Sequence, residues 1–253
     1  MMLGIHQCEA GTQGPDERLA GLADMLKRQR LDLLVCPELF LSGYAEAQVK
    51  VLAEEQDGPF GRAVADLARA HGTAIAYGYP ERAGDALFNS AALYDAQGAL
   101  IANHRKRLPS PGSFEVESFA RGSAVTFADL GGWRLAMIIC YEVEFPESLR
   151  QAAQGGAQLV LVPTALGATW GVVAEKLVPT RAFENGVWIA YADHVGAFGG
   201  LDFFGGSRIV APDGQDVAIA GRRPGLITAE LDQDRVRAMQ ARLPYLADCG
   251  KLT

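Results

Sequence analysis

The chain has 253 residues, of which 49% are hydrophobic and 21% are charged, and its 23 Lys and Arg against 30 Asp and Glu give a formal net charge of −7. Apolar residues are plentiful, and the 29 Gly and 12 Pro follow no period, which excludes a collagen-like chain and low-complexity disorder. The single basic cluster, at residues 104–107, is too short for a nucleic-acid surface, which requires clustered positive charge.

Two features of the sequence bear on location and redox state. No apolar run approaches the roughly 18 residues that span a bilayer, and residues 1–14 lack the basic and apolar regions of a signal peptide. We therefore expect a cytoplasmic protein without a membrane or nucleic-acid partner. Cys8, Cys36, Cys140 and Cys249 lack the paired spacing of metal ligands, so we expect thiols and no bound metal.

The first third of the chain alternates strand and helix patterns. Leu3 and Ile5 alternate with polar or small residues as in a strand, and apolar residues from Leu19 to Leu26 then recur at helical spacing. A short apolar run at residues 31–35, a helical pattern at residues 60–68 and a strand-like run at residues 74–77 follow. This alternation is typical of a layered α/β protein.

The rest of the chain mixes hairpins with further strand and helix units. A turn at residues 95–98 joins predicted strands at 90–94 and 100–103. The elements expected after it are a strand at 133–139, a helix that begins at Pro146, a strand at 159–162, a helix at 175–184, a strand at 187–191, hairpin turns near 212–214 and 221, and a helix at 232–243. With no linker or repeat, we expect one domain over residues 1–253, built as a four-layer αββα sandwich of two mixed sheets with helices outside.

Three ionisable residues each follow an apolar, strand-like run: Glu38, Lys106 and Cys140. Strand ends in α/β sheets converge on a common crevice, so residues distant in sequence can meet there. A thiol nucleophile needs a base to take its proton and a positive group or N–H donors to hold the oxyanion that forms. Glutamate, lysine and cysteine supply these three functions.

The segments that contain these residues resemble the three signatures of the nitrilase superfamily of carbon–nitrogen hydrolases. They are residues 35–44 (VCPELFLSGY), 105–108 (RKRL) and 139–147 (ICYEVEFPE), with further similarity at 163–165, 181–185, 206–207 and 212–214. Within the superfamily, residues 77–82, 144–147 and 244–248 are most similar to bacterial aliphatic amidases of the 5-aminovaleramide amidase type. The resemblance implies an αββα sandwich, a homodimer or higher homo-oligomer, and no metal or organic cofactor.

The residue types also predict a mechanism. Glu38 would take the proton of Cys140, whose free-thiol pKa near ~8.5 leaves little thiolate at neutral pH. The thiolate would attack an amide carbonyl, and the Lys106 ammonium and the Tyr141 backbone N–H would hold the oxyanion. Ammonia would leave with the proton from Glu38, and water activated by Glu38 would hydrolyse the thioester.

The second glutamate of the family pattern matches Glu115, which would orient Lys106 and the substrate amide nitrogen, although Glu117 lies only two residues away. Residues after Thr164 and around Asp193 are expected to shape the acyl pocket. If the substrate carries an amino group, Asp193 or Asp202 could pair with it.

Other aromatic, cysteine and histidine residues have weaker functional interpretations. Trp170, Phe198 and Phe203 could line a pocket but are more often core or dimer contacts. Cys8, Cys36 and Cys249 are read as packing residues. We expect the four histidines to be non-catalytic, with His194 as the strongest exception; they are His6, His71, His104 and His194.

Several positions depart from the usual family pattern. Glu142 stands where Asp is common, Arg107 where a neutral residue is common, and Asp193 where Asn is frequent, and Pro179 is expected to interrupt the helix before Arg181. The expected function is hydrolysis of small aliphatic carboxamides, including amino acid amides. Hydrolysis of nitriles or of N-carbamoyl groups on the same site, or a catalytically silent binding or assembly protein, are the alternatives.

Overall fold

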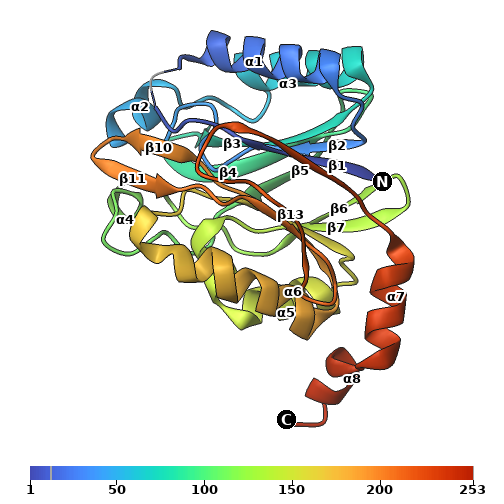
Figure 1. Cartoon of the computed structure of the whole chain (residues 1–253). Coiled ribbons are helices and arrows are strands. Elements are labelled where there is room, and N and C mark those ends of the chain that lie inside the picture. Colours follow the sequence, from blue (N-terminus) through green and yellow to red (C-terminus); the bar gives the residue numbers. More distant parts are fainter. Residues whose placement is uncertain (12, 253) are drawn as a thin grey trace.

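The computed structural model describes residues 1–11 and 13–252. Two six-stranded sheets lie face to face, and helices cover their outer surfaces (Figure 1). The helices over the first sheet are α1 (Pro15–Arg28) and α3 (Pro59–His71), and those over the second are α5 (Pro146–Gln154) and α6 (Val178–Asn185). The predicted αββα sandwich is confirmed. Among the described residues, no helix has the length and hydrophobicity to cross a membrane.

The two sheets have the same number of strands and the same arrangement of parallel and antiparallel neighbours. The first contains, in spatial order, β14 (Gly225–Glu230), β1 (Met2–Gln7), β2 (Leu33–Val35), β3 (Ala74–Ala83), β4 (Ala86–Tyr94) and β5 (Leu100–Arg105). The second contains β13 (Asp216–Ile219), β12 (Arg208–Val210), β9 (Trp188–Ala192), β8 (Leu159–Pro163), β7 (Trp133–Met137) and β6 (Thr126–Leu130). In each sheet three neighbouring strands are parallel, and the remaining neighbours pair antiparallel.

The parallel strands determine where the polar residues meet. Glu38 follows β2, Cys140 follows β7, and Thr164 and Asp193 directly follow β8 and β9. Lys106 directly follows β5, which runs parallel to β3 because both pair antiparallel with β4. Since the carboxyl ends of strands that run in one direction lie at one edge of a sheet, each sheet presents its polar residues at a single edge.

Apolar side chains from both sheets fill the space between them. Leu3 and Ile5 of the first sheet and Leu135, Met137 and Trp188 of the second are buried in this central core. Each outer face of a sheet forms a further core with its helices. Strands β2, β8 and β9 are therefore buried on both faces, which explains their continuous apolar sequences.

Several elements differ from the sequence expectation. Strand β2 begins at Leu33, two residues after the start of the apolar run, and the Leu31 carbonyl before it accepts a hydrogen bond from the Thr73 hydroxyl. A hairpin of β10 (Val195–Phe198) and β11 (Leu201–Phe204) was not predicted, since its glycines obscure the strand pattern. The expected interruption before Arg181 takes the form of a π-helical turn, η3 (Val173–Leu177), after which α6 begins with Pro179 in its first turn, and the chain stays helical from residue 171 to residue 185.

The remaining helical segments lie in the loops or at the C-terminus. They are α2 (Glu46–Val51), α4 (Glu115–Ser118), the 3₁₀ turns η1 (Cys140–Glu144) and η2 (Ala168–Trp170), α7 (Gln233–Arg242) and α8 (Tyr245–Cys249). The predicted C-terminal helix corresponds to α7, whose N-cap Asp232 accepts a hydrogen bond from the backbone of Asp234. Beyond it, α8 lies away from the sheets (Figure 1).

Candidate active site

Glu38 lies in the tight loop that follows β2, and its side chain is fully buried. The next residue, Leu39, has a left-handed backbone with φ of 48°, which is strained for a side chain of this kind. The loop rests directly on β3 at Gly78, where an added Cβ would lie 2.3 Å from the Leu39 backbone nitrogen. The loop can take this path only because residue 78 has no side chain.

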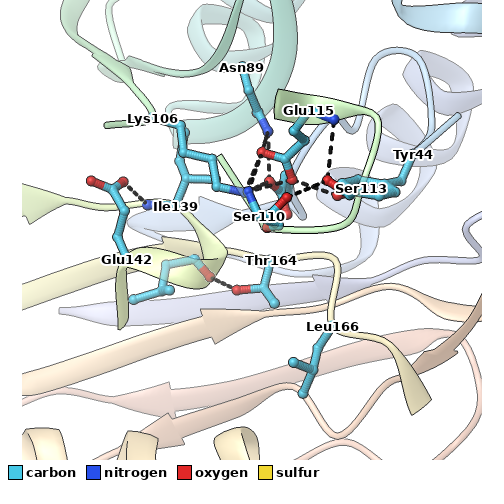
Figure 2. A network of polar contacts seen from close by, with 12 residues as sticks. Tyr44, Asn89, Lys106, Ser110, Ser113, Glu115, Ile139, Glu142, Thr164 and Leu166 are labelled. Atoms are coloured by element: carbon cyan, nitrogen blue, oxygen red, sulfur yellow. Dashed lines mark hydrogen bonds and ion pairs between the residues drawn. The ribbon is translucent and has the colours of Figure 1, made fainter. Parts of the chain in front are cut away.

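Lys106 bridges two buried carboxylates, those of Glu38 and Glu115, the second of which is labelled beside it in Figure 2. Its Nζ donates to Glu38 Oε1 at 2.6 Å and to Glu115 Oε1 at 2.8 Å, and it reaches the Ser110 hydroxyl at 3.1 Å. Only 2% of Lys106 is exposed, and neither glutamate has exposed surface. A buried lysine of this kind is stable as an ammonium only because two anions neutralise it.

Glu115, and not Glu117, is the second glutamate at Lys106. Glu115 begins α4 and points inward, whereas Glu117, two residues later, is exposed on the same short helix. The Tyr44 hydroxyl also donates to Glu115 Oε1 at 2.5 Å. The structure thus separates two residues that the sequence left as alternatives.

Asn89, in the middle of β4, was missed by the sequence analysis. Its Nδ2 donates to Glu38 Oε1 at 2.7 Å and to Glu115 Oε2 at 3.3 Å, so that it joins the two carboxylates (Figure 2). The available signal was a polar Asn-Ser pair inside an otherwise apolar strand, because a polar side chain buried there needs a partner.

Cys140 starts η1 with φ of 47°, a second strained position at the site, and is 7% exposed. Burial and then the negative charge of Glu38 raise the pKa of the Cys140 thiol well above its usual value, while Lys106 opposes the rise. Glu38 Oε2 has no hydrogen-bond partner in the described part of the chain. The structure therefore brings the three predicted groups into one buried site, with the thiol neutral at rest.

The pKa values of Glu38 and Glu115 shift in opposite directions in this site. Burial raises the pKa of Glu38 despite the opposing charge of Lys106. Burial acts on Glu115 in the same direction, but the charge of Lys106 and the hydrogen bonds from Lys106, Tyr44 and Ser110 outweigh it and hold the pKa of Glu115 below its ordinary value. The site therefore favours the neutral carboxyl form more strongly at Glu38 than at Glu115.

Hydrogen bonds to the Glu142 carboxylate hold the turn that contains Cys140. Glu142 Oε2 accepts from the Ile139 backbone N–H and from His104 Nε2, both at 2.8 Å, and its Oε1 accepts from Arg107 Nε at 2.6 Å. Glu142 and Arg107, the two departures from the family pattern, are therefore partners of each other. Tyr141 lies in the first turn of η1, where helical N–H groups lack acceptors within the helix. Oxyanion binding by the Tyr141 N–H stays a prediction.

Thr164, Asp193 and His194 support the site from the second sheet. The Thr164 carbonyl accepts the Glu38 N–H at 3.4 Å. Asp193 Oδ1 accepts hydrogen bonds from the backbone N–H groups of Leu166 and His194, each at 2.8 Å. It therefore links the segment after β8 to the segment after β9. His194 Nε2 donates to the Glu38 main-chain carbonyl at 2.7 Å, and burial lowers the pKa of His194 to about 3. His194 is thus a neutral support of the Glu38 loop, while substrate contacts of Thr164 and Asp193 stay predictions.

The remaining candidate residues lie in different environments. Phe203 is buried against Tyr44, with 6.1 Å between ring centroids, and Phe198 packs on the same cluster, whereas Trp170 is 63% exposed. Cys36 and Cys8 are buried in the core between the first sheet and its helices, where Cys8 Sγ also contacts His194 Nδ1 at 3.4 Å and accepts from Arg18 Nη1 at 3.7 Å, whereas Cys249 is partly exposed on α8. Within residues 1–11 and 13–252, no cluster of three His, Cys, Asp or Glu side chains could hold a metal ion.

The fold and site define a hydrolase of the αββα type with a buried glutamate, lysine and cysteine. The carbon–nitrogen hydrolase family model matches residues 11–241, and the chain belongs to that family, within the nitrilase superfamily. It is 41% identical to a protein of Pseudomonas protegens named "Hydrolase in pqqF 5'region", over 98% of this chain and 88% of that protein. It is 33% identical to an (R)-stereoselective amidase of Pseudomonas sp., over 86% of this chain and 79% of that one.

Solved structures agree with this assignment. The NitN amidase of Nesterenkonia sp. AN1 superposes with a TM-score of 0.85 at 36% identity, covering 96% of this chain and 98% of that one. A glutamate-to-glutamine variant of that amidase carries acrylamide added to its active-site cysteine. The chain is therefore a carbon–nitrogen hydrolase of the amidase class, in which catalysis uses an active-site cysteine.

Proposed function

We propose that this enzyme hydrolyses small aliphatic carboxamides, including amino acid amides, to a carboxylate and ammonia through a thioester on Cys140. The observation that carries the proposal is the Lys106 ammonium held between Glu38 and Glu115 beside the buried Cys140 thiol. The relatives that are named amidases support the same reaction class.

Each step uses a group whose position supports it. Glu38 accepts the Cys140 proton through its unpartnered Oε2, and the thiolate attacks the amide carbon. Lys106 and the Tyr141 N–H receive the oxyanion, and loss of one such donor typically costs about 3 kcal/mol of barrier. Glu38 then gives this proton to the amide nitrogen, the C–N bond breaks to release ammonia, and Glu38 deprotonates the water that hydrolyses the thioester. Glu115 stays anionic and keeps Lys106 in place.

A matched pair of cysteine variants tests this proposal. Wild-type protein should release ammonia from small amides such as butyramide, and it should gain one acyl mass under rapid quench. Cys140→Ala should abolish both signals, whereas Cys249→Ala, which changes a partly exposed cysteine on α8, should leave them unchanged. Turnover of nitriles or N-carbamoyl compounds in preference to amides would favour those alternative reactions. No turnover and no adduct with any of the three classes would favour a silent binding protein.

Cellular location and assembly belong to the same proposal. Absence of paired cysteine spacing favours a cytoplasmic enzyme, and the superfamily resemblance favours a homodimer or higher homo-oligomer. Light scattering coupled to size-exclusion chromatography measures the oligomeric state, and a monomer of 27.0 kDa would contradict a homo-oligomer.

A further inference from the structure

Two buried side chains that the proposed mechanism does not use form a chain of contacts that ends at Glu38. Cys8 Sγ lies 3.4 Å from His194 Nδ1, and His194 Nε2 lies 2.7 Å from the Glu38 main-chain carbonyl oxygen. Cys8 is only 3% exposed, and His194 has no exposed surface. The structure therefore pairs a cysteine with a histidine, but this cysteine is Cys8 and not Cys140.

The partners of the imidazole determine which of its nitrogens carries a hydrogen. A carbonyl oxygen can only accept, so Nε2 of His194 must be protonated in order to bond to Glu38. Burial, and then the positive charge of Arg18, lower the pKa of His194 to about 3, so the ring is neutral at neutral pH and Nδ1 is an acceptor. The contact between Cys8 and Nδ1 is accordingly a hydrogen bond that the thiol donates.

Cys8 is a thiol whose hydrogen is directed toward His194. Burial raises the pKa of Cys8 to about 11, so the thiol keeps its hydrogen at neutral pH. Arg18 is only 2% exposed and donates from Nη1 to Cys8 Sγ at 3.7 Å. Its Nε and Nη2 donate to the main-chain carbonyls of Gln13 and Gly11, each at 3.2 Å, which fixes the guanidinium. Because a guanidinium has no acceptor atom, the S–H bonds to Nδ1 and not to Arg18.

The carbonyl that His194 holds belongs to the peptide group that joins Glu38 to Leu39. Leu39 has the strained φ of 48°, so this peptide group keeps its orientation only while its surroundings hold it. A hydrogen bond received at Nδ1 also polarises the imidazole and strengthens donation from Nε2, since hydrogen bonds in a chain reinforce one another.

We propose that Cys8 is a positioning residue for Glu38: its S–H fixes the ring of His194, and the ring fixes the main chain that carries the catalytic base. This inference rests on the proposed function, in which Glu38 transfers protons, and it gives Cys8 a role beyond the packing expected from the sequence.

The positions of the hydrogens can be measured in the wild-type enzyme. ¹⁵N NMR of protein labelled at its four histidines distinguishes protonated from unprotonated ring nitrogens, and His194→Gln identifies the signals of His194. At neutral pH we expect a protonated Nε2 and an unprotonated Nδ1 that accepts a hydrogen bond. A protonated Nδ1 would overturn the proposal, whatever the activity of the enzyme.

Two substitutions of Cys8 separate the hydrogen bond from packing. Cys8→Ala removes the donor, and we expect kcat for a small amide to fall about 5- to 10-fold, the factor that corresponds to one neutral hydrogen bond, with KM within about twofold. Cys8→Ser restores an O–H donor and should recover most of the lost kcat. If Cys8→Ser is no more active than Cys8→Ala, the hydrogen bond has no role in positioning Glu38.

A double-mutant cycle distinguishes this coupling from a general loss of stability. His194→Gln retains a side-chain N–H donor for the Glu38 carbonyl but has no Nδ1, so on this background Cys8→Ala should change kcat by less than about twofold. The matched control is Cys36→Ala, which removes a second buried thiol from the same core, and any change that it makes in kcat should be equal on both backgrounds.

The outcomes separate this inference from the function on which it rests. Equal loss of kcat from Cys8→Ala on the wild-type and His194→Gln backgrounds would overturn the role of Cys8, while the amidase function stands. If wild type hydrolyses no amide, the proposed function fails and the positioning role fails with it, whereas the NMR measurement still reports whether Cys8 and His194 are hydrogen-bonded.

Discussion

At the scale of single residues, the site shows how two identical side chains acquire different chemistry. Glu38 and Glu115 both contact Lys106, but Glu38 Oε2 has no hydrogen-bond partner among the described residues and the pKa of Glu38 is raised, whereas Glu115 is surrounded by donors and has a lowered pKa. Environment, and not residue type, separates the pKa values of the two carboxyls, and in the proposed mechanism Glu38 transfers the proton while Glu115 is a fixed charge.

Replacement of Glu115 tests this division of roles. Glu115→Gln removes one of the two anions that hold Lys106, so we expect kcat on a small amide to fall about 100-fold or more, the size of effect seen when an oxyanion donor is lost. Steady-state ammonia release measures the change. Glu117→Gln alters an exposed residue of the same helix and should stay within twofold of wild type. Equal losses in the two variants would contradict the assignment of Glu115.

At the scale of elements, the site depends on loops pressed against strands. The Glu38 loop lies on β3 at Gly78. The Cys140 turn is held by Glu142, whose carboxylate accepts hydrogen bonds from His104 in β5 and from Arg107 just after β5. Both Leu39 and Cys140 adopt left-handed backbones that such contacts must maintain, because the strain of each is of order 1–3 kcal/mol.

A glycine substitution tests the close approach. In Gly78→Ala the new Cβ would lie 2.3 Å from Leu39 N and 2.7 Å from Glu38 Cα, both backbone atoms that cannot rotate away. We expect unfolding free energy to fall by about 1–3 kcal/mol, the usual cost of overpacking, and kcat/KM to fall by more than tenfold because Glu38 is displaced. Gly225→Ala, in β14 of the same sheet, places a Cβ in open space. Gly225→Ala should preserve activity. Full activity in Gly78→Ala would show that the position of Glu38 does not depend on the close contact with β3.

At the scale of the whole molecule, the buried Asp193 links folding stability to pH. Its pKa in the folded state lies well above 3.8, the value for an ordinary aspartate, chiefly because of burial. Between those two pKa values the folded protein binds one proton more than the unfolded chain at this position. The contribution of Asp193 to stability is therefore present below the unfolded pKa and is lost as pH rises through the folded pKa.

Denaturant unfolding over a pH series measures this linkage. Asp193→Asn keeps the oxygen that caps Leu166 and His194 but cannot ionise, so its stability relative to wild type should increase with pH by up to about 1.4 kcal/mol per pH unit within that window. Asp202→Asn, on the exposed β11, should parallel wild type. A pH-independent difference between Asp193→Asn and wild type would show that Asp193 stays ionised.

How far the sequence predicts the molecule depends on the range of the interactions involved. Strand and helix positions follow from local periodicity, and Glu38, Lys106 and Cys140 were identified because each follows an apolar run inside a motif with a chemical rationale. The role of Asn89 was missed because its partner Glu38 lies far away in sequence, and the local β10–β11 hairpin was missed because its glycines obscure the strand pattern.

The amino-acid sequence by itself determined the layered architecture, the family and the three reactive groups, because hydrophobic spacing and residue chemistry are properties of short segments. Only the tertiary structure decided which of Glu115 and Glu117 meets Lys106, that Glu142 and Arg107 are partners, and that His194 supports Glu38 through its main-chain carbonyl. The physical reason is that pKa values and hydrogen-bond partners depend on burial and on charges brought together from separate strands. Those quantities exist only once the two sheets have packed.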